Sequence, residues 1–210
     1  MINFFSKCVL TLFGLGFSPI APGTVASFAG ILIGGFLITL EYGYLYLIIL
    51  PFLFWWLGTV CLKATLSSFA SDDPSEVVID ELVGQLVALW PLTLGLFAIE
   101  SGILIGILIN DTFLLFLVKN LLSNPLFQPL IFELIPLNRY LFLSLLSLFL
   151  LFRFFDIKKP FWVGRIDRQK TTNSIMLDDI VAGLFAGAVF LTFIFLFYIL
   201  SLFSGLAIID

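Results

Sequence analysis

Two pairs of neighbouring acids are the residues of this chain best suited to chemistry. Asp80-Glu81 and Asp178-Asp179 each stand where a polar segment passes into a long apolar run. If the fold brings the pairs together, their carboxylates repel one another unless a cation or bound protons neutralise them. Ligands that are all oxygen favour Mg²⁺ or Ca²⁺, and Mg²⁺ is the usual companion of phosphate groups. The four acids therefore predict a metal site.

The small residues that follow each pair give a reason for the pairs to meet. They form two stripes, Asp80-xxx-Gly84-xxx-Ala88 and Asp179-xxx-Gly183-xxx-Gly187. Residues four apart lie on one face of a helix, and small residues there let two helix backbones approach closely inside a membrane. We expect the stripes to face each other, so that Asp80 and Asp179 meet.

Charge is concentrated in a second segment, between the last two apolar runs. Ten of the 24 charged residues lie between positions 153 and 179. Arg153, Lys158 and Lys159 are suited to phosphate binding by bidentate and point-charge contacts. A plainer explanation stays open for both sets of charges. Acids in the first turn of a helix favour the helix dipole, and Lys and Arg residues could serve only to orient the chain in a membrane.

The composition indicates the kind of protein that carries these charges. Hydrophobic residues make up 61% of the chain and charged residues 11%, against roughly 45–50% and about 25% in soluble domains. A soluble fold of this size cannot bury so much apolar surface, so we predict an integral membrane protein. The expected fold is all-α, a polytopic bundle that forms one domain over residues 1–210. No basic surface indicates binding of nucleic acid.

Two residue types narrow the chemistry further. The chain has no histidine, which excludes a Ser-His-Asp relay, a His-ligated zinc site and the His-dependent lipid phosphatases. Cys8 and Cys61 form no CxxC pair, and neither has an arginine six residues on, as a Cys-based phosphatase would need. We expect both cysteines to act as buried small hydrophobic residues.

The apolar runs predict the helices that position the charges. Residues 1–17 are expected to form a short helix on the membrane surface or dipping into it. Spanning segments are expected at 25–40, 45–62, 82–99, 140–152 and 175–203. Lys63 and the basic segment 153–170 share one side, so the positive-inside rule puts this side, with the acids, in the cytoplasm. The path of 98–138 stays open.

Four connecting features carry more specific predictions. Segment 18–27, SPIAPGTVAS, is either a helix-start turn capped by Ser or Thr or a re-entrant loop that faces a polar ligand. Asp73 followed by Pro74 has the form of a helix N-cap and first helical residue. Segment 161–170 is expected to be a polar, basic loop, and Ser174 to cap the last helix.

Four motifs occur in a fixed order along the chain: LGFSPIAPGTVAS, DDPSEVVIDELVGQ, FRFFDIKKP and SIMLDDIVAGLFAG. Together they resemble the phosphatidylglycerophosphatase A family. The resemblance implies an all-helical, Mg²⁺-dependent phosphatase of the bacterial cytoplasmic (inner) membrane, which converts phosphatidylglycerophosphate to phosphatidylglycerol and phosphate. The chain departs from the family pattern at Phe161-Trp162, where a Trp-Pro pair is usual, and in 98–138, which looks like an insertion.

The resemblance also implies roles for individual residues. Catalysis would fall to Asp80, Glu81, Asp156, Asp178 and Asp179. Asp80, Glu81, Asp178 and Asp179 would hold the metal, and Asp156 is a further metal ligand, a general acid or the partner of a nearby lysine. Substrate binding would fall to Arg153, Lys159, Ser18, Thr24, Ser27 and Asp73. The partners would be the phospholipid substrate and membrane lipids, and the oligomeric state stays open.

Two rival functions use similar residues. A CDP-alcohol phosphatidyltransferase also works with acids and Mg²⁺ at a membrane, but its signature of spaced Asp residues with an intervening Ala-Arg is absent. A membrane cation transporter or channel would use Asp111, Glu133 and the four acids as ion sites within the bilayer.

The predicted metal site can be tested by neutralising one acid of each pair. We expect Asp80→Asn and Asp179→Asn each to abolish metal-dependent turnover while leaving expression in the membrane intact, because each change removes a ligand charge but hardly alters volume. Phosphate release from a phospholipid, assayed with and without Mg²⁺, measures the effect. Normal activity in either variant would contradict the site.

Overall fold

The computed structural model describes residues 2–65, 74–94, 138–169 and 171–206. The described part is built of helices and contains no strand, in agreement with the predicted all-α class. Its elements in chain order are α1 (Ile2–Leu10), the 3₁₀ turn η1 (Leu15–Phe17), α2 (Pro22–Ile38), α3 (Gly43–Thr65), α4 (Ile79–Ala88), α9 (Asn138–Lys158), α10 (Trp162–Asp167) and α11 (Thr172–Leu206). Most of the predicted insertion, with Asp111 and Glu133, lies outside the described residues.

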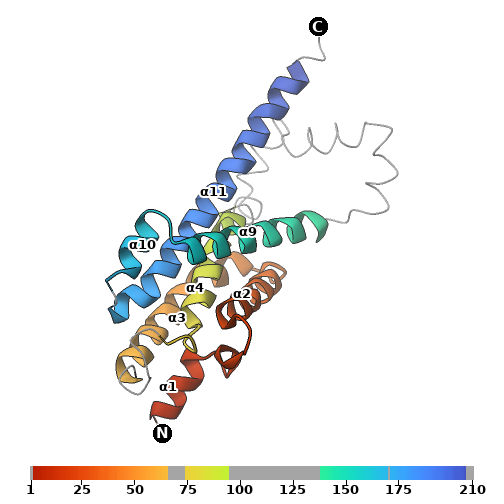
Figure 1. Cartoon of the computed structure of the whole chain (residues 1–210). Coiled ribbons are helices and arrows are strands. Elements are labelled where there is room, and N and C mark those ends of the chain that lie inside the picture. The colour runs from red at the N-terminus through yellow and green to blue at the C-terminus, as the bar shows by residue number, and fades with distance from the viewer. Residues whose placement is uncertain (1, 66–73, 95–137, 170, 207–210) are drawn as a thin grey trace.

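Helix α4 is the centre of the bundle. Every residue from Ile79 to Ala88 except Glu81 is buried, and α2, α3, α9 and α11 all pack against it. Figure 1 shows this short helix enclosed by the longer ones. A helix that is covered on all sides must be apolar or small on all sides. The polar exceptions at its first turn, Asp80 and Glu81, therefore need a specific explanation.

The two stripes of small residues face each other, as predicted. A Cβ atom added at Gly183 of α11 would lie 2.2 Å from the carbonyl oxygen of Gly84. A Cβ added at Gly84 would lie 2.5 Å from the carbonyl oxygen of Asp179. Only glycine allows backbones to come this close, so α4 and α11 touch main chain to main chain directly beneath the acids.

Helix α2 approaches the neighbouring face of α4 by the same means. An added Cβ would lie 2.1 Å from Leu89 Cδ1 at Gly34 and 3.0 Å from Gln85 Cβ at Gly30. At Gly23, in the first turn of α2, it would lie 2.2 Å from Oε1 of Glu81. The glycines of α2 thus bring its N-terminal turn against the acidic end of α4.

A proline inside α3 fixes the chain that follows α4. Pro51 has no N–H to donate to the carbonyl of Leu47, one helical turn earlier. The indole Nε1 of Trp90 donates to that carbonyl instead, at 3.0 Å. The Trp90 ring also packs against Phe52, with a centroid distance of 5.8 Å. The Leu47 carbonyl, which Pro51 leaves without its helical partner, therefore accepts a hydrogen bond from a side chain of another segment.

The predicted loop at 18–27 is helical over its second half. Helix α2 begins at Pro22, a position where the missing N–H has no intrahelical role. This agrees with the helix-start interpretation, and the re-entrant path in a membrane stays a prediction. The predicted Ser or Thr cap is wrong, because the N-cap is Ala21, with φ of 45° and no side-chain hydrogen bond.

The acidic segment becomes helical later than predicted. Val78 and not Asp73 is the N-cap of α4, and Pro74 is not its first residue. The backbone N–H of Val78 donates to the carbonyl of Leu10 at 2.9 Å, which holds this stretch outside the helix and joins it to the end of α1. Asp73 itself lies outside the described residues.

Two predictions around 161–174 are also corrected. Segment 161–170 is not a loop throughout, since it contains α10. The cap of α11 is Thr171 and not Ser174. The N–H of Ser174 donates to Oγ1 of Thr171 at 3.1 Å, while the N–H of Thr171 donates to Oγ of Ser174 at 2.8 Å. This reciprocal pair is a capping box in which serine stands at the third helical position.

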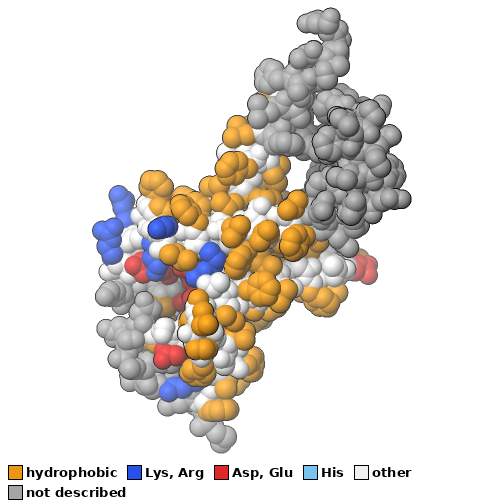
Figure 2. Space-filling view, turned by 45° about the vertical axis from the view of Figure 1, so that its right-hand side comes forward, with side chains coloured by type: hydrophobic (Ala, Val, Ile, Leu, Met, Phe, Trp, Pro, Cys, Tyr) orange, Lys and Arg blue, Asp and Glu red, His pale blue; other side chains and the backbone are white. Residues whose placement is uncertain are grey.

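Two of the described helices, Gly43–Thr65 and Thr172–Leu196, are long and apolar enough to cross a membrane. Large hydrophobic side chains on α2, α3, α9 and α11 are exposed. Figure 2 shows such side chains over much of the visible surface, whereas Lys and Arg gather toward one side. An apolar surface of this extent is typical of contact with lipid. The fold therefore supports membrane association.

The contact between α4 and α11 predicts a large effect of one methyl group. Gly183→Ala should lower the free energy of unfolding by about 1–3 kcal/mol, because the added carbon meets backbone that cannot move aside. Thermal unfolding in detergent measures the loss. Gly35→Ala is the control, since its Cβ would meet only a side-chain carbon of Leu145, at 3.1 Å. Equal stability of Gly183→Ala and wild type would contradict the close contact.

Candidate active site

Three acids from α4 and α11 form one cluster. Asp80, Glu81 and Asp179 each offer a carboxylate oxygen, and these oxygens all lie within 4.8 Å of one another. Asp80 and Asp179 are only 7% and 4% exposed, and Glu81 is half-buried. The meeting of Asp80 with Asp179 that the stripes predict is therefore present. We call these three residues the acid cluster.

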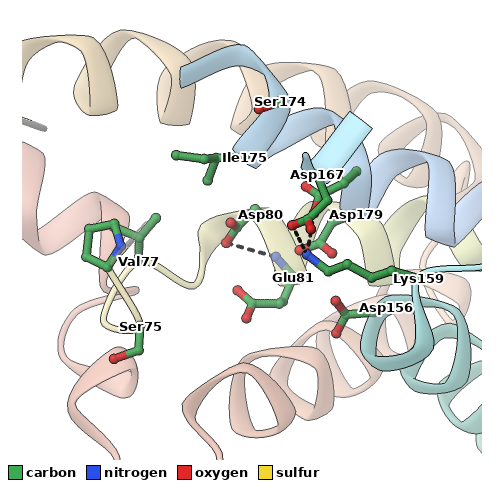
Figure 3. A pocket seen from close by; sticks show the side chains of 12 residues that line it. Ser75, Val77, Asp80, Glu81, Asp156, Lys159, Asp167, Ser174, Ile175 and Asp179 are labelled. Carbon is green, nitrogen blue, oxygen red and sulfur yellow. Dashed lines mark hydrogen bonds and ion pairs between the residues drawn. The ribbon is translucent and has the colours of Figure 1, made fainter. Parts of the chain in front are cut away.

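The fourth predicted acid, Asp178, belongs to a neighbouring ion-pair group. Lys159 Nζ donates to Oδ2 of Asp178 at 2.7 Å and to Oδ1 of Asp167 at 2.5 Å. Asp178 is 5% exposed, whereas Lys159 and Asp167 are about one-third exposed. Lys159 therefore links the start of α11 to the end of α10, beside the acid cluster (Figure 3).

The position of Lys159 follows from the chain reversal after α9. Lys159 has φ of 44°, a left-handed conformation that ends the helix, and Pro160 prevents its continuation. Helix α10 then packs closely on this turn, since a Cβ added at Gly164 would lie 2.5 Å from the carbonyl oxygen of Lys159. The turn and the glycine together bring the ammonium group back toward α11.

Arg153 lies at the same end of α9, against α2. Its Nη1 is 3.3 Å from Oγ of Ser27 and forms an ion pair with Asp156, one turn later on α9. Ser27 is fully buried, and its hydroxyl donates to the carbonyl of Gly23 at 2.8 Å. A Cβ at Gly23 would lie 3.4 Å from Nη1 of Arg153. Arg153 is thus close to both α2 and the acid cluster.

The acid cluster, Asp156 and the ion-pair group of Lys159 line one cavity of about 230 Å³, which Arg153 and Ser27 do not line. Its lining comes from the segment before α4, from α4 itself, from the end of α9, from α10 and from the start of α11: Pro74, Ser75, Val77, Asp80, Glu81, Asp156, Lys159, Asp167, Ser174, Ile175, Asp178 and Asp179. Figure 3 shows carboxylates on several sides of this space and Lys159 reaching into it. The cavity combines a buried anionic wall with a cation, as a phosphate site with a metal would need.

Burial changes the proton affinity of the groups around the cavity. Removal from water raises the pKa of Asp80 well above its usual value, and the neighbouring Glu81 raises it further. Burial also raises the pKa of Glu81. For Lys159, burial alone lowers the pKa, but the hydrogen bonds to Asp167 and Asp178 outweigh this and raise it. Lys159 therefore stays charged at neutral and mildly alkaline pH.

The donor set of the cavity fits a hard divalent cation. Glu81 Oε2 and Asp178 Oδ1 are buried, and neither has a hydrogen-bond partner among the described residues. Buried carboxylate oxygens are costly without a partner, and a divalent cation would supply one while neutralising the acid cluster. The acid cluster can therefore bind a metal ion.

The other predicted substrate-binding residues that the structure describes, Ser18, Thr24 and Ser27, do not line this cavity. Ser18 lies in the turn before α2, where its hydroxyl donates to the carbonyl of Ile20 at 3.0 Å. Thr24 lies in the first turn of α2, next to Gly23, and Ser27 contacts Arg153. Asp73 lies outside the described residues, so its role stays a prediction.

Sequence reasoning missed two polar residues here. Asp167 forms an ion pair with Lys159. In the sequence it lies among charges of both signs, a pattern that indicated only a polar loop. Gln85 is fully buried one turn after Glu81, and neither of its amide atoms has a hydrogen-bond partner within the described part of the chain. The sequence could have indicated Gln85, because it lies four residues after Glu81, and residues four apart share one face of a helix.

Comparison with known proteins identifies the family of the chain and a relative. The model of the family described as phosphatidylglycerophosphatase A matches residues 8–194, nearly the whole chain. A protein of Bacteroides thetaiotaomicron named "Putative phosphatidylinositol-3-phosphatase" is 27% identical over 195 residues, which cover 88% of this chain and 90% of that protein. No solved structure matches the chain.

The double ion pair of Lys159 predicts a change in its reactivity. Asp167→Asn removes one of the two carboxylates that raise the pKa of Lys159 while leaving it buried, so the pKa should fall. The neutral fraction of the amine at mildly alkaline pH then grows about tenfold for each unit of that fall. Labelling of Lys159 by an amine-reactive reagent, read by mass spectrometry, measures this change.

Exposed Lys158 is the internal reference for this experiment, because its labelling rate should be the same in both proteins. The raised pKa of Lys159 also decides how this residue contributes to stability as the pH changes. The contribution of the charged Lys159 to stability is fully present below its unfolded pKa and is lost only as the pH rises through the folded one. Unchanged labelling of Lys159 in Asp167→Asn would contradict the ion pair.

Proposed function

The chain belongs to the phosphatidylglycerophosphatase A family and is a lipid phosphatase, a phosphoric monoester hydrolase, and we propose that it hydrolyses the terminal phosphate of phosphatidylglycerophosphate. The observation that carries this proposal is the cavity in which the acid cluster faces Lys159. A phosphate monoester dianion needs cationic partners on more than one side. Lys159 and Arg153 would supply positive charge on one side of the phosphate. A metal ion bound to the acid cluster would supply it on the other side.

Mg²⁺ is the metal we propose for the acid cluster. Asp80, Glu81 and Asp179 would hold it, because hard carboxylate oxygens without nitrogen or sulfur ligands favour this ion at phosphate sites. Asp178 lines the same cavity, and its Oδ1, which has no hydrogen-bond partner among the described residues, would let it join them. When bound, the ion would polarise the phosphoryl group and lower the pKa of an attacking water.

The cations of this chain would bind and orient the phosphate. Lys159 lines the cavity, held between Asp167 and Asp178, so its ammonium group is preorganised to stabilise charge on the phosphoryl oxygens. Arg153 would add a planar donor group, which Asp156 and Ser27 keep in place close to Glu81. In this proposal Asp156 acts mainly by orienting Arg153.

The proposed setting is the cytoplasmic face of the bacterial inner membrane. Helices α3 and α11 would cross the bilayer, with the cavity near the start of α11 and the end of α9. Lys63 at the end of α3 and the basic residues around α10 would then lie together on the cytoplasmic side, where positive charge is favoured. The phosphate would stay at the interface while the acyl chains remain in the bilayer.

A phosphorylated inositol lipid is the second substrate to consider, because the Bacteroides relative carries a name of that kind. Both substrates present a phosphate monoester on a polyol headgroup attached to diacylglycerol. The groups described so far bind the phosphate and do not read the polyol. Phosphatidylglycerophosphate takes precedence because the family model covers nearly the whole chain.

A phosphate-release assay on the purified protein tests the proposal. We expect release from phosphatidylglycerophosphate in detergent micelles to require Mg²⁺ and to exceed release from phosphatidylinositol 3-phosphate. Glu81→Gln should lower the rate about 100-fold or more, because the change removes a ligand charge. Glu41→Gln is the matched control, since Glu41 is exposed and does not line the cavity.

Two outcomes would overturn the proposal in different ways. Preferred hydrolysis of the inositol lipid would keep the reaction and change the substrate. Absence of phosphate release from every phospholipid, together with cation flux in liposomes that Glu81→Gln abolishes, would favour the transporter interpretation.

A further inference from the structure

Helices α2 and α9 border an apolar groove that the proposed reaction does not yet use. The groove has a volume of about 430 Å³, and its walls are Phe28, Ile31, Leu32, Gly35 and Phe36 of α2 with Phe142, Leu145, Leu146 and Phe149 of α9. None of the described residues that line it is charged. We propose that this groove holds one acyl chain of the phospholipid whose phosphate enters the acidic cavity, an inference that rests on the proposed function.

The register of α9 connects the groove to the active site. Its lining residues recur at the three- and four-residue intervals of one helix face, from Phe142 to Phe149. The next positions on this face are Arg153, four residues after Phe149, and Asp156, seven residues after it. One stripe of α9 thus changes from apolar to charged within a single turn.

Helix α2 shows the same change at the same end. Ser27 lies four residues before Ile31, and Thr24 lies four residues before Phe28, so both hydroxyl residues continue the groove face toward the N-terminus of α2. Two contacts mark the boundary. The rings of Phe28 and Phe149 meet edge to face at a centroid distance of 6.3 Å, and Ser27 meets Arg153 one turn beyond.

The dimensions suit part of an acyl chain. From residue 28 to residue 36 the α2 wall extends about 12 Å at the helical rise of 1.5 Å per residue. Gly35 contributes to the hollow because it has no side chain, and a Cβ there would come within 3.1 Å of Leu145. Phe28, Leu32, Phe36 and Phe142 are all more than half exposed, so the described residues leave these walls accessible.

The groove runs on into the polar residues Arg153 and Ser27, and this favours an acyl chain of the substrate over other occupants. Lipid tails are as apolar as the groove walls, so the groove gains little from the hydrophobic effect itself. Its effect would be to align a chain with Arg153 and Ser27 and thereby direct the headgroup toward the cavity. A helix of a second copy could cover the same walls, but it would leave the change to charged residues at one end unexplained.

Photolabelling tests the occupant directly. The probe is phosphatidylglycerophosphate with a diazirine at the middle of one acyl chain, added to the full-length Asp179→Asn protein in micelles so that turnover does not consume it. We expect labelling on the groove walls, chiefly at Leu32 and Leu146, to exceed by about tenfold that from phosphatidylcholine with the same chain. Equal labelling by both lipids would mean bulk lipid only, and cross-linked dimers would mean a second copy; either result overturns the proposal.

Variants that fill the groove provide the kinetic test. Leu32→Trp and Leu146→Trp should raise KM for long-chain phosphatidylglycerophosphate about tenfold and leave hydrolysis of the deacylated, water-soluble headgroup unchanged. Ile49→Trp on α3 is the control, because Ile49 is 57% exposed, close to the 59% of Leu32, and lies outside the groove. Its KM for both substrates should match wild type.

The results separate the groove from the proposed function. Wild-type hydrolysis of the long-chain lipid with no change in either tryptophan variant would overturn the groove and keep the function. Loss of activity on both substrates in these variants would indicate general damage to the active site and would also contradict the groove. Failure of the wild type to hydrolyse either substrate would overturn the function itself.

Discussion

The contact between the backbones of α4 and α11 is the constraint on which the rest of the structure depends. Gly84 and Gly183 meet so closely that any larger residue would push the helices apart. Because Asp80 and Asp179 stand one turn before these glycines, the same contact forces two carboxylates together in a largely buried position. The helix packing, and not the loops, therefore sets the geometry of the acid cluster.

Clustered, buried acids are unfavourable in a fold that contains only protein atoms. Burial and mutual repulsion both oppose ionisation, and two of the buried carboxylate oxygens lack hydrogen-bond partners among the described residues. Sites of this kind are retained when a ligand uses them. The nearby cations form ion pairs: Lys159 with Asp167 and Asp178, and Arg153 with Asp156. This arrangement of charges is consistent with the proposed binding of a metal and a phosphate.

The molecule separates polar chemistry from apolar surface along its helices. The start of α2, the end of α9 and the start of α11 bring polar residues to one region, and the remaining turns of these helices expose Phe, Leu and Ile. A phospholipid has the same division between headgroup and chains. An enzyme with this arrangement can bind the phosphate in a polar cavity without withdrawing the lipid from the bilayer.

The sequence by itself determined the helical class, the membrane setting and the pairing of two acid-plus-glycine stripes, because hydrophobic runs and four-residue spacing are local properties of the chain. Charge that stands out in an apolar chain also predicted phosphate binding by Arg153, Lys158 and Lys159, and this stays a prediction. Only the tertiary structure decided where α4 begins, that α10 forms, and which partners the cations take. These features depend on contacts between distant segments: Val78 bonds to Leu10, and Arg153 reaches Ser27 across 126 residues. No local pattern encodes such contacts, since they exist only after the helices have packed.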